Sequence, residues 1–215
     1  MFELPEFITL ARQLTETVTG KTVERGSLGN SPHKFVWYNR TPEEFAALTA
    51  GKVVGPARTR GKFLFVPLEP GYRLLFGDCG GRLLYHPRGA RLPDKCHLWL
   101  AFDDGSSLTE MTQMWGAIEL HEAGRERERP YLKDMRPTPV EPEFTFAYFS
   151  GLIDSLLAGE KRSAKGLLTQ EQFIPGLGNS LAPDILFRAG LHPRHPPAGL
   201  SAAQRRTLYA AILST

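Results

Sequence analysis

Apolar positions along the chain follow two different periods. Over residues 6–18 they recur every three or four positions and stop before Gly20, which predicts an amphipathic helix. A capping box with proline at 41–44 predicts a short second helix that ends near Gly51. Short apolar runs bounded by glycine or proline predict antiparallel strands at 52–58, 62–67, 73–77, 82–86, 96–102, 107–111 and 117–120.

The period changes beyond a charged, proline-rich stretch at 123–142. One helix face is predicted to carry Phe146, Phe149, Leu152, Ile153, Leu156 and Leu157. A second capping box, at Ser201 and Gln204, opens another helix. We therefore predict an α+β protein with an N-terminal helix and antiparallel β-sandwich domain (1–122), a linker (123–142) and a helical domain (143–215).

Composition narrows the class of protein without naming a function. The 215 residues are 41% hydrophobic and 23% charged, with 26 Lys and Arg against 23 Asp and Glu, which fits a globular chain that tolerates nucleic acid as a partner. No apolar run is long enough to span a membrane, and the acidic start at 1–6 is unlike a secretory signal, so we expect a cytoplasmic, bacterial-type, nucleoid-associated protein.

The cysteines and histidines do not predict a metal site. Cys79 and Cys96 lie far apart in the sequence, and we expect two buried free thiols. The six histidines, which have no metal-ligand spacing and are expected to be structural or surface residues, are His33, His86, His97, His121, His192 and His195.

A glycine turn at 175–179 is the most informative segment. Gly176 and Gly178 permit positive φ and close backbone approach, and Asn179 lies where a helix is expected to begin. Exposed N–H groups at a helix N-terminus bind phosphate, and Lys165 is a candidate for the same anion. The alternatives are an ordinary interhelical turn with an Asn cap and a solvated lysine.

Two charged clusters also admit two interpretations. Arg58, Arg60 and Lys62 could neutralise phosphates or could guard a solvated strand edge. Glu3 and Glu6 could supply a general acid beside the α-amine or could complement a helix dipole. A third cluster, at 125–129, alternates in sign and is interpreted as solvated linker.

Three segments together resemble the formamidopyrimidine-DNA glycosylase and endonuclease VIII family. The opening MFELPE is similar to that family's MPELPE start, and RGKFL at 60–64 resembles its R-G-K-Y-L strand. The stretch KGLLTQEQFIPGLGNSLAPDILFRAGLHP at 165–193 resembles its helix-two-turn-helix motif and is the most specific of the three. The resemblance covers essentially the whole chain.

The resemblance implies a partner and a set of phosphate-binding residues. The partner would be double-stranded DNA with a damaged base, lying in a cleft between the sandwich and the helical helix-two-turn-helix domain. Lys62 and Asn179 would bind phosphates around a flipped nucleotide, and Arg60 and Lys165 are further candidates. We expect a monomer with no membrane partner.

The resemblance also implies that the catalytic residues lie at the N-terminus of the chain. Glu3 would be the acid that acts at the deoxyribose ring, with Glu6 as a second glutamate near it. The family nucleophile is the amine of a proline after the initiator Met, whereas this chain has Phe2. If Met1 is retained, its amine is displaced by up to ~3.5 Å. The attacking group would then be water or the Met1 amine, with weak or no lyase activity.

Other family residues are replaced. The family's H-L-G-M-S/T-G stretch becomes FGDCGG at 76–81, so Cys79 takes the position of the methionine that fills the gap left by a flipped base. Its D-x-R-R/K-F-G stretch becomes MTQMWG at 111–116, where Met114 and Trp115 could form an apolar wedge or belong to the core. The family's four-cysteine zinc finger has no counterpart in these residues, so we expect no cofactor and no metal in this chain.

Two functions follow from the sequence. The first is a base-excision repair glycosylase that flips and removes a damaged base. The second is a non-catalytic DNA-binding relative that keeps Lys62 and Asn179. Phe2 and the replaced readout residues favour the second function, whereas Glu3 and Glu6 favour the first because carboxylates near a phosphate backbone weaken binding.

Overall fold

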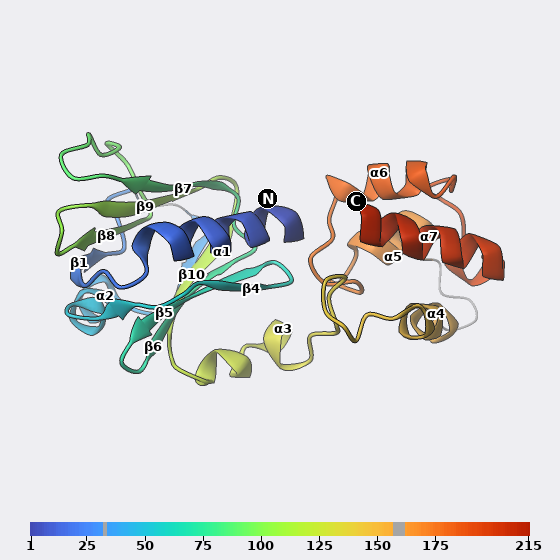
Figure 1. Ribbon diagram of the computed structural model, residues 1–215, viewed down its shortest axis with the longest axis horizontal. Coiled ribbons are helices and arrows are strands. Elements are labelled where there is room, and N and C mark those ends of the chain that lie inside the picture. Colours follow the sequence, from blue (N-terminus) through green and yellow to red (C-terminus); the bar gives the residue numbers. More distant parts are fainter. Residues whose placement is uncertain (32–33, 157–161) are drawn as a thin grey trace. The chain divides into compact units, whose positions relative to one another are not determined.

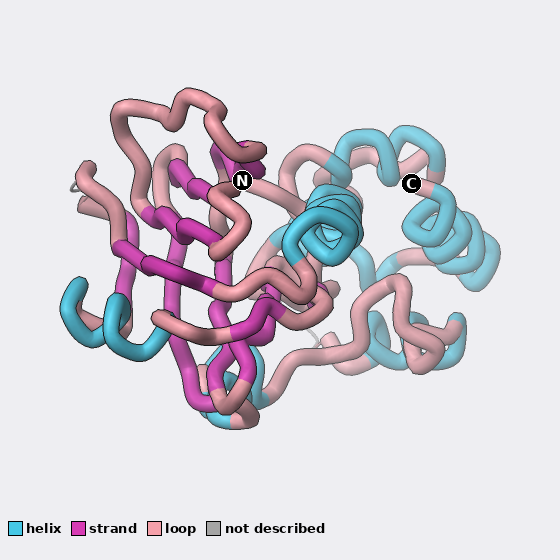
Figure 2. Tube along the Cα trace, turned by 60° about the vertical axis from the view of Figure 1, so that its left-hand side comes forward, coloured by secondary structure: helices cyan, strands magenta, loops and turns pink. Residues whose placement is uncertain are grey.

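Strands occupy only the first part of the chain, together with some helices, and the rest is helical (Figure 2). The computed structural model describes residues 1–31, 34–156 and 162–215 and divides into two units, Met1–Asp134 and Met135–Thr215. All strands among the described residues lie in the first unit, and the second unit is helical. The predicted α+β class is confirmed. The boundary between the units falls inside the segment predicted as a linker.

The first unit is a β-sandwich with helices at its margins (Figure 1). Its elements are α1 (Leu4–Val18), β1 (Val23–Ser27), β2 (Val36–Tyr38), α2 (Pro42–Thr49), β3 (Val53–Val54), β4 (Arg58–Arg60), β5 (Phe63–Glu69), β6 (Tyr72–Gly77), β7 (Gly81–His86), β8 (Leu98–Phe102), β9 (Ser107–Thr112), β10 (Gly116–Glu122), η1 (Arg125–Glu128) and α3 (Pro130–Lys133). One sheet has the order β1-β8-β9-β7; the other has the order β2-β10-β6-β5-β3, with β4 paired to β5.

The alternation of side chains along the strands builds the sandwich core. In β5, Leu64, Val66 and Leu68 are buried in the core cluster, whereas Phe65 and Pro67 point to the opposite face of the sheet. Facing strands supply the other buried side chains, including Leu74, Phe76, Leu98, Leu100, Phe102, Ile118 and Leu120. Burying each large apolar side chain contributes roughly 1.5–3 kcal/mol. This core supports the loops that carry the polar residues of the candidate site.

Helix α1 packs on the sandwich and begins earlier than its periodicity predicts. Its buried face consists of Leu4, Phe7, Ala11, Leu14 and Val18. It packs against β4 and β5 (Figure 1). The helix starts at Leu4 because Glu3 caps it, and it ends at Val18, ahead of Gly20 with φ +84°.

The strand prediction was incomplete in two places. Strands β1 and β2 were not predicted, and the expected run at 52–58 is broken by Gly55 and Pro56 into β3 and β4. All pairings among the named strands are antiparallel except that of β2 with β10, which is parallel. Local patterns missed this pair because β2 has only three residues and the two strands are far apart in sequence.

Residues 123–134 are not a solvated linker as predicted. They form η1 and α3 and belong to the first unit. Glu126 is 3% exposed and pairs with Arg73 of β6. Arg129 bonds Glu119 of β10 at 3.2 Å and lies over the Phe63 ring at 4.8 Å. The alternating charges therefore have partners on the outer face of the six-stranded sheet.

The second unit is a small helical domain with its own core. Its elements are α4 (Phe146–Asp154), α5 (Ala164–Thr169), α6 (Leu181–Arg188), η2 (Pro197–Gly199) and α7 (Ala202–Ser214). Phe149, Leu152 and Ile153 are buried as predicted, while Leu157 lies outside the described residues. The capping box of Ser201 and Gln204 opens α7 as predicted.

A carboxyl group is buried inside the sandwich. Glu110 of β9 is 3% exposed; its Oε1 accepts a hydrogen bond from the Thr112 hydroxyl at 2.6 Å, and its Oε2 has no hydrogen-bond partner among the described residues. The nearby His97 Nδ1 accepts the Thr112 N–H at 2.9 Å, so this ring nitrogen carries no proton. Burial raises the pKa of Glu110 from 4.5 to about 7.

This pKa predicts a pH-dependent penalty on stability. The folded state holds the Glu110 proton between pH 4.5 and about 7, so stability falls as pH rises through that window. Glu110→Gln should therefore stabilise the protein more at pH 8 than at pH 5, by roughly 2 kcal/mol, in urea unfolding measured at both pH values. Glu16→Gln, on the exposed face of α1, is the matched control. An equal effect of Glu110→Gln at both pH values would contradict this account.

Candidate functional site

The N-terminus of α1 holds a buried carboxylate. Glu3 is 3% exposed and is the N-cap of the helix. Its N–H donates to the Glu6 carboxylate at 3.1 Å, and its own carboxylate accepts from the Glu6 N–H in a reciprocal capping box. Glu3 and Glu6 thus have a structural role at the helix N-terminus, which was the alternative to a catalytic one. The same bonds fix the direction in which residues 1 and 2 leave the helix.

The two residues before Glu3 are held against the segment that joins the sheets. The Phe2 N–H donates to the Cys79 carbonyl at 2.9 Å, and the Phe2 ring meets Phe7 edge-on at 5.9 Å. A Cβ placed on Gly80 would lie 2.7 Å from the Met1 nitrogen, so only glycine permits this approach. The α-amine of Met1 is therefore positioned by backbone contacts next to Gly80.

Lys62 contacts the same joining segment. It occupies the second position of a two-residue turn between β4 and β5, in which Gly61 has φ +58°. Lys62 is 7% exposed, which excludes the predicted alternative of a solvated strand edge at this residue. Its carbonyl accepts the Asp78 N–H at 3.1 Å.

Residues 78–80 thus connect the candidate residues of the first unit. They pass from β6 in one sheet to β7 in the other, binding Lys62 on one side and Phe2 on the other. Asp78 has φ +46°, an unusual conformation for a residue with a side chain. The sandwich therefore gathers Met1, Phe2, Glu3 and Lys62 around one short crossing.

Asp78 was not among the residues predicted from the sequence. Burial raises the pKa of its carboxyl group, and the charges of Lys62 and Arg129 oppose that rise. The H-L-G-M-S/T-G stretch of the family has glycine at this position. A departure from that glycine was the signal that sequence reasoning could have used.

The turn between β9 and β10 carries exposed apolar side chains. Met114 is 73% exposed with φ +71°, and Trp115 is 53% exposed, which excludes the alternative that they belong to the core. The adjacent strand β2 and the residue before it add two exposed aromatic side chains that sequence reasoning missed, Trp37 (66% exposed) and Phe35 (49% exposed). Their alternation around the buried Val36 was the available signal.

Cys79 does not fit its predicted place as an intercalating residue. Its side chain is 4% exposed, and burial raises the pKa of its thiol well above the usual range. The core of the sandwich covers it. Cys79 and Cys96 are both buried free thiols, as predicted.

In the second unit, the glycine turn precedes α6. Gly176 has φ +94°, as a glycine turn permits. Its N–H donates to Gln172 Oε1 at 3.2 Å, so the prediction that this N–H is exposed to bind an anion is wrong. The Gly178 carbonyl accepts the Ala182 N–H at 3.1 Å and starts the first helical turn. Asn179 follows it and is exposed.

Lys165 and Arg60 have different surroundings. Lys165 is exposed in α5, and its backbone N–H donates to the Pro193 carbonyl at 3.0 Å. Arg60 is half-buried and ends β4 immediately before the Gly61–Lys62 turn. Lys165 therefore belongs to the helical unit with Asn179, and Arg60 belongs to the sandwich with Lys62.

The described residues offer neither a metal cluster nor a membrane-spanning helix. Within 1–31, 34–156 and 162–215, no group of three or more His, Cys, Asp or Glu side chains could hold a metal ion. Two cysteines do not suffice for a four-cysteine zinc site. In the same ranges no helix is long and apolar enough to cross a bilayer. Of the six histidines, His97 is buried and His33 lies outside the described residues.

Comparison with known proteins gives a consistent family. Residues 1–115 match the formamidopyrimidine-DNA glycosylase N-terminal domain. The formamidopyrimidine-DNA glycosylase of Bacillus licheniformis is 32% identical over 216 residues, which cover 100% of this chain and 76% of the relative.

Solved structures share the fold. The MutM (Fpg) protein from Thermus thermophilus superimposes with a TM-score of 0.78 at 28% identity, covering 99% of this chain and 73% of that one. The Lactococcus lactis Fpg in complex with DNA containing an abasic site gives a TM-score of 0.83 at 23% identity, covering 99% and 77%. The matches place the chain among the DNA glycosylases. It belongs to the formamidopyrimidine-DNA glycosylase family.

Proposed function

We propose that this protein is a base-excision repair glycosylase that binds double-stranded DNA and hydrolyses the N-glycosidic bond of a damaged base. The observation that carries the proposal is the buried Glu3 carboxylate beside an anchored amino terminus and Lys62. Such a site would offer an acid, an amine and a candidate phosphate-binding cation to one substrate. The names of the relatives supply the substrate class.

Glu3 is the proposed catalytic residue. It would donate a proton at the deoxyribose ring or stabilise an oxocarbenium-like state while the base leaves. Glu6 would act as a positioning residue, because its carboxylate holds the Glu3 N–H and so fixes the first turn of α1. Flipping the base out of the helix costs about a few kcal/mol of unstacking free energy, and damage to the base lowers this cost.

Four cationic or polar residues are proposed to bind the DNA backbone. Lys62 and Arg60 would do so from the sandwich, and Asn179 and Lys165 from the helical unit. The charge of the buried Lys62 acts on the Asp78 carboxyl group, and a phosphate would be a further anionic partner at the same turn. Met114 and Trp115 would fill the gap left by the flipped base, since both are exposed at a turn.

The lyase step is proposed to be slow or absent. The amine available at the start of this chain is primary, on Met1 or on Phe2 after processing, instead of the family's secondary amine. The Phe2 ring packs on Phe7, which ties the second residue to the core. Water, or less efficiently the Met1 amine, would then be the attacking group.

A non-catalytic DNA-binding role is the second candidate. The observation in its favour is that Glu3 and Glu6 already satisfy each other in the capping box, which gives both a structural reason to be present. Base release from duplexes carrying oxidised bases or alkylated purines distinguishes the two roles, and strand cleavage of abasic-site duplexes is scored separately. Release of any of these bases establishes the glycosylase, and the lesion released defines its substrate. A nucleoid location in the cytoplasm and a monomeric state complete the proposal.

Lys62→Ala tests the phosphate contact. If Lys62 binds phosphate, the variant should bind all duplexes more weakly to a similar degree and should lower the salt slope of log K by roughly one. Fluorescence anisotropy at several salt concentrations measures both quantities. Lys95→Ala, at an exposed position, serves as control. A slope unchanged from the wild-type value would assign Lys62 to the fold alone.

Glu3→Gln tests the acid. A glutamine keeps an oxygen that can accept the Glu6 N–H, so the helix should still form. Base release should be abolished in single-turnover assays, while DNA affinity stays equal or rises because a negative charge is lost. Glu16→Gln is the control in the same helix. Retained base release would rule out this role for Glu3.

Phe2→Pro tests the nucleophile. The wild-type protein should give little borohydride-trapped DNA adduct, and the variant should give more, because Met removal would then expose a secondary amine at the family position. Phe2→Ala is the control. This variant also permits Met removal and also loses the ring, but the amine it exposes is primary. Strong trapping by the unaltered protein, with the adduct mapped to Met1 or Phe2, would return the protein to the bifunctional glycosylases.

A further inference from the structure

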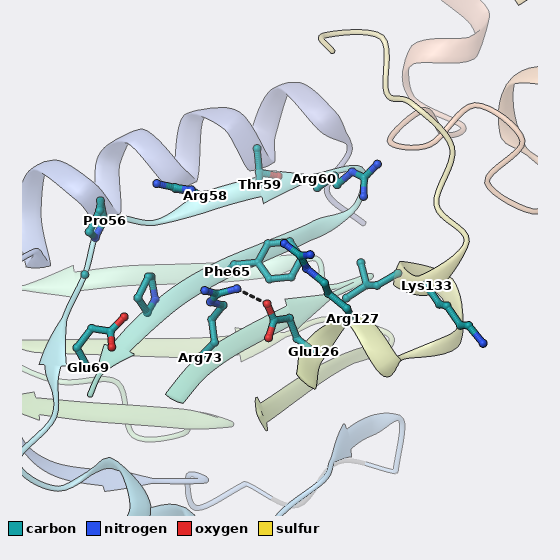
Figure 3. A pocket seen from close by; sticks show the side chains of 13 residues that line it. Pro56, Arg58, Thr59, Arg60, Phe65, Glu69, Arg73, Glu126, Arg127 and Lys133 are labelled. Carbon is teal, nitrogen blue, oxygen red and sulfur yellow. Dashed lines mark hydrogen bonds and ion pairs between the residues drawn. The ribbon is translucent and has the colours of Figure 1, made fainter. Parts of the chain in front are cut away.

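A cavity of about 790 Å³ lies on the face of the six-stranded sheet that points away from the core (Figure 3). Strand β5 contributes Phe65 and Pro67, which alternate with its core residues, and β6 contributes Arg73 opposite Pro67. Residues of η1 and α3, the segment predicted to be a solvated linker, form another wall. Neither Lys62 nor Glu3 lines it.

Cations from four elements line this cavity. They are Arg58 and Arg60 of β4, Arg73 of β6, Arg127 of η1 and Lys133 of α3. Two carboxylates, Glu69 and Glu126, also line it. Glu126 is already engaged, since it pairs with Arg73 and accepts the Gly124 N–H at 2.7 Å. The lining therefore carries an excess of positive charge.

Such an arrangement favours an anionic ligand. Like charges brought together repel one another, and an anion that enters the cavity relieves this repulsion. The Arg73–Glu126 pair, drawn as a dashed line in Figure 3, ties η1 to the sheet and holds the opposing cations in place before a ligand arrives. Arginine binds phosphate oxygens through two parallel N–H donors, which suits a ligand that carries phosphate.

One side of the cavity is apolar and aromatic. The half-buried Phe65 lies between the cations of β4 and Arg127, which extends toward it in Figure 3. Leu132, Pro56 and Pro67 complete the apolar lining. Planar bases stack on aromatic side chains, with a contribution of roughly 1–3 kcal/mol per base. The volume also falls within the range of roughly 300–1,000 Å³ of small-molecule sites.

We propose that this cavity binds a nucleotide unit, with its phosphate among the cations of the lining and its base on Phe65. The nucleotide could be free, or it could belong to a DNA strand that extends past the catalytic site. Both sources present the same phosphate and the same planar ring. Glu3 and Lys62 lie outside this cavity, Arg60 is common to it and to the proposed DNA contacts, and binding in the cavity does not depend on base release.

The first test measures binding of dGMP and of inorganic phosphate to the full chain by isothermal titration calorimetry. Arg127→Ala/Lys133→Ala should weaken dGMP binding about tenfold or more, because two charged donors are lost. Arg91→Ala/Lys95→Ala removes the same charge from an exposed loop of the same unit and should leave binding unchanged. Phe65→Leu should weaken dGMP binding and spare phosphate binding.

The second test identifies the source of the nucleotide. Undamaged duplexes of about 12 and about 30 base pairs compete with dGMP, and their affinities are measured for the same variants. Displacement of dGMP by the long duplex alone assigns the cavity to a DNA strand, and no displacement by either assigns it to a free nucleotide. The proposal is overturned if Arg127→Ala/Lys133→Ala matches its control in both dGMP and long-duplex affinity. That result would leave the glycosylase proposal intact, because base release is not the readout.

Discussion

Burial of the Glu3 carboxylate at the first turn of α1 is the constraint on which the proposed site depends. A carboxylate that is 3% exposed is stable only when its oxygens accept hydrogen bonds, and the capping box with Glu6 meets that need. The helix N-terminus adds a favourable dipole. Because the helix must then start at Leu4, Phe2 and Met1 are directed to Cys79 and Gly80, where backbone contacts hold them.

The segment that crosses between the two sheets holds the backbone of Lys62 and of Phe2 in place. Residues 78–80 leave the centre of one sheet and enter the edge of the other, and they bind Lys62 and Phe2 through main-chain groups. Main-chain hydrogen bonds of this kind do not depend on the chemistry of the side chains present. Asp78 and Cys79, which stand where the family stretch has glycine and methionine, can therefore make these bonds.

The outer face of the six-stranded sheet is the second surface for which we propose a ligand. Its charges are held by long-range pairs, Arg73 with Glu126 and Arg129 with Glu119, that fasten residues 123–134 to the sandwich. The same pairs place Arg127 and Lys133 in the lining of the cavity that Arg58 and Arg60 of β4 also line. A segment that looks like a linker by composition therefore forms a wall of a basic cavity.

The sequence by itself determined the helices α1, α2, α4 and α7, most strands, both capping boxes opened by Thr41 and Ser201, and the family. These depend on local periodicity and on short motifs, which are written in neighbouring residues. Only the tertiary structure decided the parallel pairing of β2 with β10, the burial of Glu126, and the exposure of Met114 and Trp115. Each of these depends on a partner surface far away in the chain, and burial is a property of that partner as much as of the residue.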